Sequence, residues 1–339
     1  MFFFKTLWRQ VTSSLNLKLW LWAGLTSIVF LGFVIQFIDW QELQKVIQNI
    51  SIPFFILAMI VLSLEGIFTA LRMQAFTDGS KSFISCLQVI AWFVVLLIML
   101  PARLGEVAII FLMGHFLQQN KSSALINAFT QRLLDLLVLT SFFLIFTLGL
   151  TTAIESIAFT LSALIFILIL TLAIVFLKPC LNWLSKKIAK PIETFSLRDK
   201  LVNSLHLAVI WQQEHLTYRL LIKGFLLSIA KWMCNLGGIS LLLVSFNLPL
   251  ETFMKLFLAA AYNFLAVIPL QSIGGFGINE AGLMGLLTLF SIDINLAASI
   301  SILMRLTLIA NPFIFWSLVF ITVLMYKKNT TNKKKADLS

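Results

Sequence analysis

The sequence has 339 residues, of which 60% are hydrophobic and only 12% are charged, and its mean hydropathy is +0.99. A soluble protein of this length needs a charged fraction of roughly 25% to cover its surface. This composition excludes a soluble globular protein. The apolar runs are continuous rather than alternating, which excludes a β-barrel. They predict an all-α polytopic membrane protein, because a helix satisfies its own backbone hydrogen bonds inside a bilayer.

Apolar runs of spanning length predict about six full spans. The first run, 19–38, follows three basic residues and lacks a small-residue cleavage site, so we expect an uncleaved signal anchor. The other five runs are 52–76, 133–150, 157–177, 220–246 and 297–326.

Two further apolar stretches, 83–116 and 253–290, are interrupted by Pro, Gly and charged residues. The interruptions read PARLGE at 101–106 and PLQSIGGFGINE at 269–280. Irregular backbone at membrane depth is tolerated only where protein or a water-filled cavity surrounds it. We therefore expect two broken-helix re-entrant hairpins, each turning inside the protein and leaving on the side from which it came.

The net charge of +11 is distributed unevenly along the chain. Terminal and connecting segments expected on one side carry +14, those expected on the other carry −3, and eight charges at membrane depth sum to zero. This positive-inside distribution predicts that both termini are cytoplasmic. The excess of positive charge is then explained by the orientation of the chain in the membrane and by contact with anionic lipid headgroups. This argues against nucleic acid as a partner.

We expect a single membrane domain over 1–326 and a basic disordered tail over 327–339. Residues 178–219 form the one sizeable segment outside the predicted spans. Leu197, Leu201 and Leu205 recur there at helical spacing among lysines, which fits either a cytoplasmic amphipathic helix at the membrane surface or a plain connector.

The charges at membrane depth occur in two similar arrangements. Glu106 is followed by Arg132 after 26 residues, and Glu280 is followed by Arg305 after 25. Each pair joins a hairpin carboxylate to an arginine of the following helix, and a long span precedes each hairpin. We interpret this as two copies of one unit, at about 52–150 and 220–326. Because their hairpins enter from opposite sides, the copies form an inverted-topology repeat.

Charged residues at membrane depth are costly and are therefore functional candidates, although they can also pair and simply hold a bundle together. The arginines suit phosphate oxygens, and the carboxylates suit those arginines or a cationic headgroup. Glycines at a helix start allow a phosphate close to backbone N–H groups, although they also favour helix packing. The candidate substrate-binding residues are Arg103, Glu106, Arg132, Asp135, Gly274, Gly275, Gly277, Glu280 and Arg305.

Three other charges are expected to be less important. Glu65 and Lys231, in the spans before the hairpins, are interpreted as peripheral members of the site or as a structural pair. Arg72 is expected to extend toward the cytoplasmic surface from the end of its span.

No HExxH, GxSxG or Walker motif occurs, and the three cysteines and three histidines lack metal-ligand spacing. We therefore expect no catalytic residues, no metal, no cofactor and no enzymatic activity. Transport would then be passive or driven by an ion or proton gradient. Glu106, Asp135 and Glu280 would be its candidate proton carriers.

Four short motifs, in order, carry a family resemblance: PARLGE at 101–106, QRLLDLL at 131–137, GGFGINEAG at 274–282 and MRL at 304–306. Together they resemble the lysylphosphatidylglycerol synthase transmembrane-domain family, also described as flippase-like integral membrane proteins, over nearly the whole chain. Gln131, Ile273 and Asn279 depart from the family pattern, which leaves the headgroup preference open. The resemblance implies a multi-pass protein of the bacterial cytoplasmic (inner) membrane, and a stand-alone member without the soluble synthase domain.

The resemblance also implies a role in moving lipids between leaflets. We expect a flippase- or scramblase-like translocase for an anionic or aminoacylated phospholipid, or for a polyprenyl-phosphate-linked lipid. The alternative is a non-catalytic membrane subunit that scaffolds or regulates a lipid-modifying glycosyltransferase or synthase, with 178–219 as its docking surface. An intramembrane transferase is less favoured, because no nucleophile–base pair is recognisable.

Overall fold

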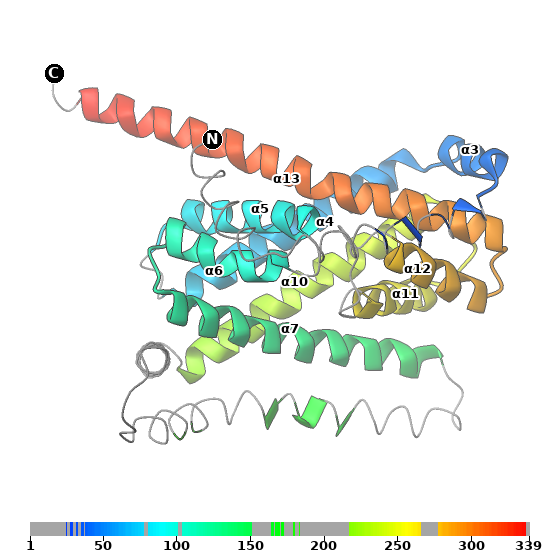
Figure 1. The fold of residues 1–339 in the computed structure, drawn as a ribbon, viewed down its shortest axis with the longest axis horizontal. Helices are drawn as coiled ribbons and strands as arrows, with labels where there is room; N and C mark the ends of the chain where they lie inside the picture. Colours follow the sequence, from blue (N-terminus) through cyan, green and yellow to red (C-terminus); the bar gives the residue numbers. More distant parts are fainter. Residues whose placement is uncertain are drawn as a thin grey trace.

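The computed structural model describes residues 38–77, 81–100, 104–150, 217–265 and 277–336, together with single residues between 25 and 36 and between 164 and 183. Every regular element in the five long ranges is an α-helix. The helices run roughly parallel or antiparallel to one another in one bundle (Figure 1). The all-α prediction is therefore confirmed for this part of the chain.

Four of the described helices are long and apolar enough to cross a membrane: α4 (Ile52–Ala75), α7 (Lys121–Leu150), α10 (Tyr218–Ser245) and α13 (Ile294–Ala336), whose apolar part ends at Tyr326. They correspond to four of the six expected spans. Most of the expected spans at 19–38 and 157–177 and nearly all of the basic segment 178–219 lie outside the described residues.

Two helices extend beyond the apolar runs from which they were predicted. α7 begins at Lys121, so Arg132 lies within it, and α13 continues to Ala336 through the lysines where a disordered tail is expected. Its sequence after Pro312 contains no further proline and no glycine to end the helix. At 43 residues, α13 is about 64 Å long, roughly twice the thickness of a bilayer core. Its C-terminal end projects from the bundle (Figure 1).

The two interrupted stretches form pairs of short helices. α5 (Phe83–Met99) packs against α6 (Leu104–Phe116), and α11 (Thr252–Leu265) packs against α12 (Ile278–Leu289). With 12 to 17 residues each, these helices are shorter than the roughly 20 residues that cross a bilayer. They match the predicted re-entrant hairpins, although the turns between their helices lie outside the described residues.

The helices before, within and after each hairpin pack in corresponding ways. In the first set α4 contacts α5 and α6 contacts α7; in the second set α10 contacts α11 and α12 contacts α13. Between the sets, α4 contacts α10, α7 contacts α10 and α11, and α13 contacts α4 and α5. Exchanging the two sets leaves this pattern of neighbours unchanged. The inverted-topology repeat itself stays a prediction. The hairpins lie at opposite ends of the bundle, and α7 and α13 run in opposite directions (Figure 1).

The two ends of the bundle also differ in the charges they carry. The α6–α7 connection, the start of α10 and the C-terminus lie at one end, which contains Lys121, Arg219 and Lys223. α3 (Trp40–Gln48) and the α12–α13 connection lie at the other end, with Glu42 and Asp293. This separation follows the charge distribution that was derived from the sequence.

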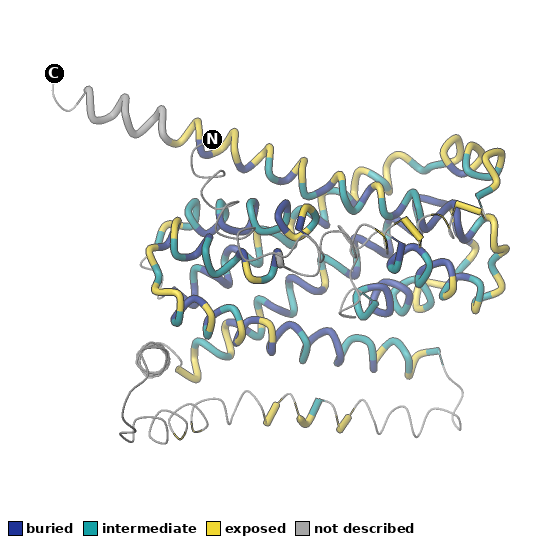
Figure 2. Tube along the Cα trace, viewed as in Figure 1, coloured by how far each residue is buried: buried dark blue, intermediate teal, exposed yellow. Residues whose placement is uncertain are grey.

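Small residues let the central helices approach closely, as is common in membrane proteins. A Cβ added to Gly238 of α10 would lie 2.6 Å from Leu62 Cγ of α4, and one added to Gly66 of α4 would lie 2.4 Å from the Phe315 ring of α13. Buried residues line these contacts, and exposed apolar residues cover the outward faces (Figure 2). The bundle is therefore apolar outside as well as inside, which suits a lipid environment.

Candidate functional site

A buried ion cluster joins α4, α7 and α10 near the middle of the bundle. The Arg72 guanidinium donates to both carboxylate oxygens of Asp135, at 2.6 and 3.0 Å, and Lys231 Nζ donates to Asp135 Oδ2 at 2.9 Å. Trp232 Nε1 donates to Asp135 Oδ1 at 3.1 Å. The Arg72, Asp135 and Lys231 side chains are only 3%, 6% and 10% exposed. Ion pairing and hydrogen bonding of this kind are what make buried charges tolerable.

The position of Arg72 corrects the sequence prediction. Rather than extending to the surface, its side chain is buried, and it also donates to Gln131 Oε1 at 3.1 Å and to Ser228 Oγ at 2.5 Å. Four acceptor atoms from two neighbouring helices replace the water that would otherwise solvate the guanidinium. Arg72 therefore belongs to the interior of the protein.

The predicted pair of Glu106 and Arg132 is present, although it is set apart from this cluster. Arg132 on α7 donates to Glu106 Oε1 on α6 at 2.5 Å, and the two side chains are 44% and 33% exposed. Arg132 and Asp135 are three residues apart, yet Arg132 points toward α6 whereas Asp135 points toward α4 and α10. One helix thus presents a buried anion and an accessible cation within a single turn.

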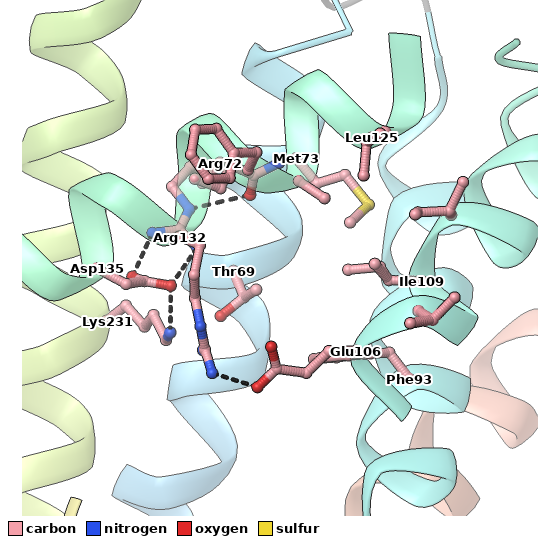
Figure 3. Close-up of a pocket in the computed structure, with 15 residues that line it drawn as sticks. Thr69, Arg72, Met73, Phe93, Glu106, Ile109, Leu125, Arg132, Asp135 and Lys231 are labelled. Atoms are coloured by element: carbon pink, nitrogen blue, oxygen red, sulfur yellow. Dashed lines mark hydrogen bonds and ion pairs between the residues drawn. The ribbon is translucent and has the colours of Figure 1, made fainter. Parts of the chain in front are cut away.

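Both ion groups line one cavity of about 250 Å³. Figure 3 shows the Arg132 side chain reaching toward Glu106, with Asp135 and Lys231 on the other side of Arg132. The polar residues of its wall are Thr69, Arg72, Glu106, Gln131, Arg132, Asp135 and Lys231.

Apolar side chains form the rest of the cavity wall. Val107, Leu125 and Phe129 line the pocket and are among the exposed large apolar residues of the protein. The cavity therefore joins a polar interior to an apolar outer rim between α6 and α7. Among the described side chains that line it, three cations face two carboxylates, an excess of one positive charge that favours an anionic ligand.

The second predicted pair is also present, at the other hairpin. Arg305 Nε of α13 lies 3.4 Å from Glu280 Oε1 of α12, and an Arg305 terminal nitrogen lies 3.5 Å from the Tyr262 hydroxyl of α11. Glu280 Oε2 accepts from the backbone N–H of Gly277 at 2.6 Å. Gly277, the N-cap of α12, has φ 92°, a conformation that glycine adopts without strain.

The two corresponding pairs differ in accessibility. The Arg305 and Glu280 side chains are 13% and 1% exposed, against 44% and 33% for Arg132 and Glu106. The pair of the first hairpin thus faces an open cavity, whereas the pair of the second hairpin is enclosed.

Not every predicted site residue can be placed. Arg103, Gly274 and Gly275 lie outside the described residues. No described residue of α11 or α12 lines the cavity, which draws instead on α4, α5, α6, α7 and α10. Within the described ranges, no group of His, Cys, Asp and Glu side chains is arranged to hold a metal ion.

Sequence reasoning did not predict the role of Lys231, which binds Asp135, or the lining residues Thr69 and Gln131. Glu65, the expected structural partner of Lys231, instead accepts from Asn235 Nδ2 at 2.8 Å. The opposite charges of Asp135 and Lys231 at membrane depth were the one available signal for their pairing.

A comparison with protein-family models matches residues 20–315 to the lysylphosphatidylglycerol synthase TM region. The chain belongs to this family. The match includes both hairpins, the four motifs and both ion pairs, so the resemblance drawn from the motifs is confirmed, as is the assignment to membrane proteins. Searches of curated proteins and of solved structures gave no match.

Proposed function

We propose that this member of the lysylphosphatidylglycerol synthase TM family is a lipid translocase, of the flippase or scramblase type, that moves a lipid with an anionic headgroup between leaflets. The observation that carries the proposal is the partly exposed Arg132–Glu106 pair at a cavity of about 250 Å³ in a largely apolar bundle. We call this space, lined by the residues given above, the headgroup cavity.

Arg132 is the residue best placed to bind a phosphate. Its planar guanidinium can donate two parallel hydrogen bonds to phosphate oxygens, and its exposure leaves it accessible to a ligand. Glu106 compensates its charge when the cavity is empty, and a bound phosphate would take over that role. The released Glu106 carboxylate could then accept hydrogen bonds from hydroxyl or ammonium groups of the headgroup.

The buried cluster supports this exchange without taking part in it. Asp135 holds Arg72 and Lys231 at fixed positions behind Arg132, so the inner wall of the headgroup cavity stays positive. The exposed apolar rim at Val107, Leu125 and Phe129 would let acyl chains remain in the membrane while the headgroup enters. The polar cavity would thus hold the headgroup, and the apolar rim would contact the acyl chains.

The corresponding packing of the two helix sets suggests how movement would occur. Inverted-topology repeats are common in transporters that expose one site alternately to the two sides. In the present arrangement the ion pair of one hairpin is open and that of the other is enclosed. Exchange of these two states would carry a headgroup from one side to the other.

The proposed substrates are anionic or aminoacylated phospholipids and polyprenyl-phosphate-linked lipids. The proposed setting is the bacterial cytoplasmic membrane, with both termini cytoplasmic and hairpin α5–α6 at the cytoplasmic end. The proposal involves no covalent step.

Reconstitution into vesicles tests the proposal. Labelled phosphatidylglycerol, lysylated phosphatidylglycerol or polyprenyl phosphate would be followed across the bilayer with a quencher that does not cross it. We expect the protein to accelerate at least one of these lipids over phosphatidylcholine, and we expect Arg132→Ala to remove most of that acceleration. Arg219→Ala removes an exposed cation at the start of α10, away from the headgroup cavity, and is the matched control. No acceleration of any anionic lipid would refute translocation and favour the scaffolding alternative.

A further inference from the structure

Glu65 lies one turn deeper in α4 than Thr69, which lines the headgroup cavity. Its Oε2 accepts from Asn235 Nδ2 of α10 at 2.8 Å, and Asn235 Oδ1 accepts from Asn263 Nδ2 of α11 at 2.8 Å. A hydrogen-bonded chain of polar side chains therefore runs from Glu65 through Asn235 to Asn263. Tyr262, the residue before Asn263 on α11, contacts Arg305 of the second hairpin's ion pair.

Glu65 differs from the other carboxylates within the described membrane-depth helices. Asp135, Glu106 and Glu280 each have a cation within 4 Å, at 2.6, 2.5 and 3.4 Å. Among the described residues no cation lies that close to Glu65, which accepts a hydrogen bond from the neutral amide of Asn235.

The charges that face Glu65 are engaged elsewhere. Lys231 of α10 and Arg72 of α4 both bind Asp135 of α7, and Cys234 is the other titratable group of α10 beside Glu65. From α11 the neighbouring side chain is the amide of Asn263, bonded to Asn235. Where α13 meets α4, the Ser63 hydroxyl donates to Asn311 Oδ1, a neutral contact.

A carboxylate at membrane depth without an ion-pair partner is costly in its charged form, and binding a proton removes that cost. Glu65 lies one helical turn from Thr69, which lines the headgroup cavity, and we take the cavity as the route by which a proton reaches it. We propose that Glu65 is a reversible proton-binding site, and that its proton travels with the headgroup. The second half of this inference rests on the translocase function proposed above.

Coupling to a proton would balance the negative charge of the lipid headgroup. A headgroup with one phosphodiester carries one negative charge, and one proton on Glu65 compensates it. Moving the two together transfers no net charge, so the membrane potential does no work on the step. Proton uptake on one side and release on the other would then drive the lipid.

Infrared spectroscopy of the purified full-length protein in lipid discs tests the proton site without any transport assay. We expect a protonated-carboxyl band that disappears as pH rises, that is absent in Glu65→Gln and that persists, shifted, in Glu65→Asp. Glu42→Gln, which changes an exposed carboxylate of α3, is the control and should keep the band. Identical spectra for wild type and folded Glu65→Gln would overturn the proposal. Circular dichroism and gel filtration establish folding, and Glu65→Asp serves if Glu65→Gln does not fold.

Vesicles with a pH gradient test the coupling. For one proton per lipid, a gradient of one pH unit should produce about a tenfold leaflet asymmetry of the labelled anionic lipid. We expect Glu65→Gln to move lipid without developing this asymmetry. If wild type moves lipid but ignores the gradient, or Glu65→Gln still follows it, the coupling is wrong while translocation stands. If wild type moves no lipid, translocation and its coupling both fail, and the infrared result alone decides the proton site.

Discussion

Arg132 and Glu106 are 26 positions apart in the sequence, and their side chains meet at 2.5 Å on the wall of a cavity that both leave partly open. Twenty-five positions separate Arg305 from Glu280, which meet in the same sense but out of reach of solvent. The molecule thus contains two Arg–Glu pairs on corresponding helices, one accessible and the other enclosed.

The first prediction concerns the geometry of the Arg132 guanidinium. Arg132→Lys keeps the charge but loses the planar donor pair, so we expect lipid movement to fall by about tenfold, and Arg132→Ala to lower it by about a hundredfold. Initial rates in reconstituted vesicles measure both. Equal rates for Arg132→Lys and wild type would show that only the charge matters.

The second prediction concerns the buried cluster. Asp135→Asn leaves Arg72 and Lys231 buried without their shared anion, which should destabilise the protein by about 3–5 kcal/mol. Thermal unfolding in detergent measures this loss. Adding Lys231→Met to Asp135→Asn removes one of the two stranded cations and should recover part of the stability. No recovery in the double variant would contradict the pairing.

The third prediction compares the two corresponding ion pairs. Glu280→Gln weakens an enclosed pair and the N-terminal cap of α12, so it should cost about 1–3 kcal/mol of folding free energy. Glu106→Gln weakens a pair that is already half exposed and should cost less than about 1 kcal/mol. The order of the two unfolding temperatures checks the difference in burial. The reverse order would mean that the second pair, not the first, is the open one.

The fourth prediction uses two neighbouring glycines of α10. A Cβ at Gly238 would lie 2.6 Å from Leu62 Cγ, whereas one at Gly237 would meet nothing within 4 Å. Gly238→Ala should therefore destabilise the contact between α4 and α10 by about 1–3 kcal/mol, and Gly237→Ala should leave stability unchanged or raise it slightly. Leu62→Ala in the Gly238→Ala background should relieve the clash, and unfolding curves of the three variants provide the comparison.

Hydropathy and the breaks at proline and glycine were enough to predict the long helices and both hairpins, because these depend on local sequence. The spacing of Glu106 to Arg132 and of Glu280 to Arg305 also predicted both pairs, since each joins a hairpin to the next helix. The Arg72–Asp135–Lys231 cluster was missed for the opposite reason. Its members are 63 and 96 positions apart and meet only because α4, α7 and α10 cross at one point.

The same limit applies to Glu65. In the sequence, Lys231 is the obvious counter-ion for Glu65. Only the packing of α7 shows that Lys231 binds Asp135 instead. Distance from a helix end was likewise a poor guide to Arg72. Burial there is decided by a carboxylate on another helix and not by the length of the side chain.

α13 contacts α12 of one hairpin and α5 of the other, with Pro312 between the two contact regions. Proline lacks the N–H that would bond to the carbonyl four residues earlier, so the helix is least stiff at this position. A shift of either hairpin along the bundle is therefore expected to slide α13 past Gly66 or to bend it at Pro312. One helix thus contacts both hairpins, and the position at which we expect it to bend belongs to neither ion pair.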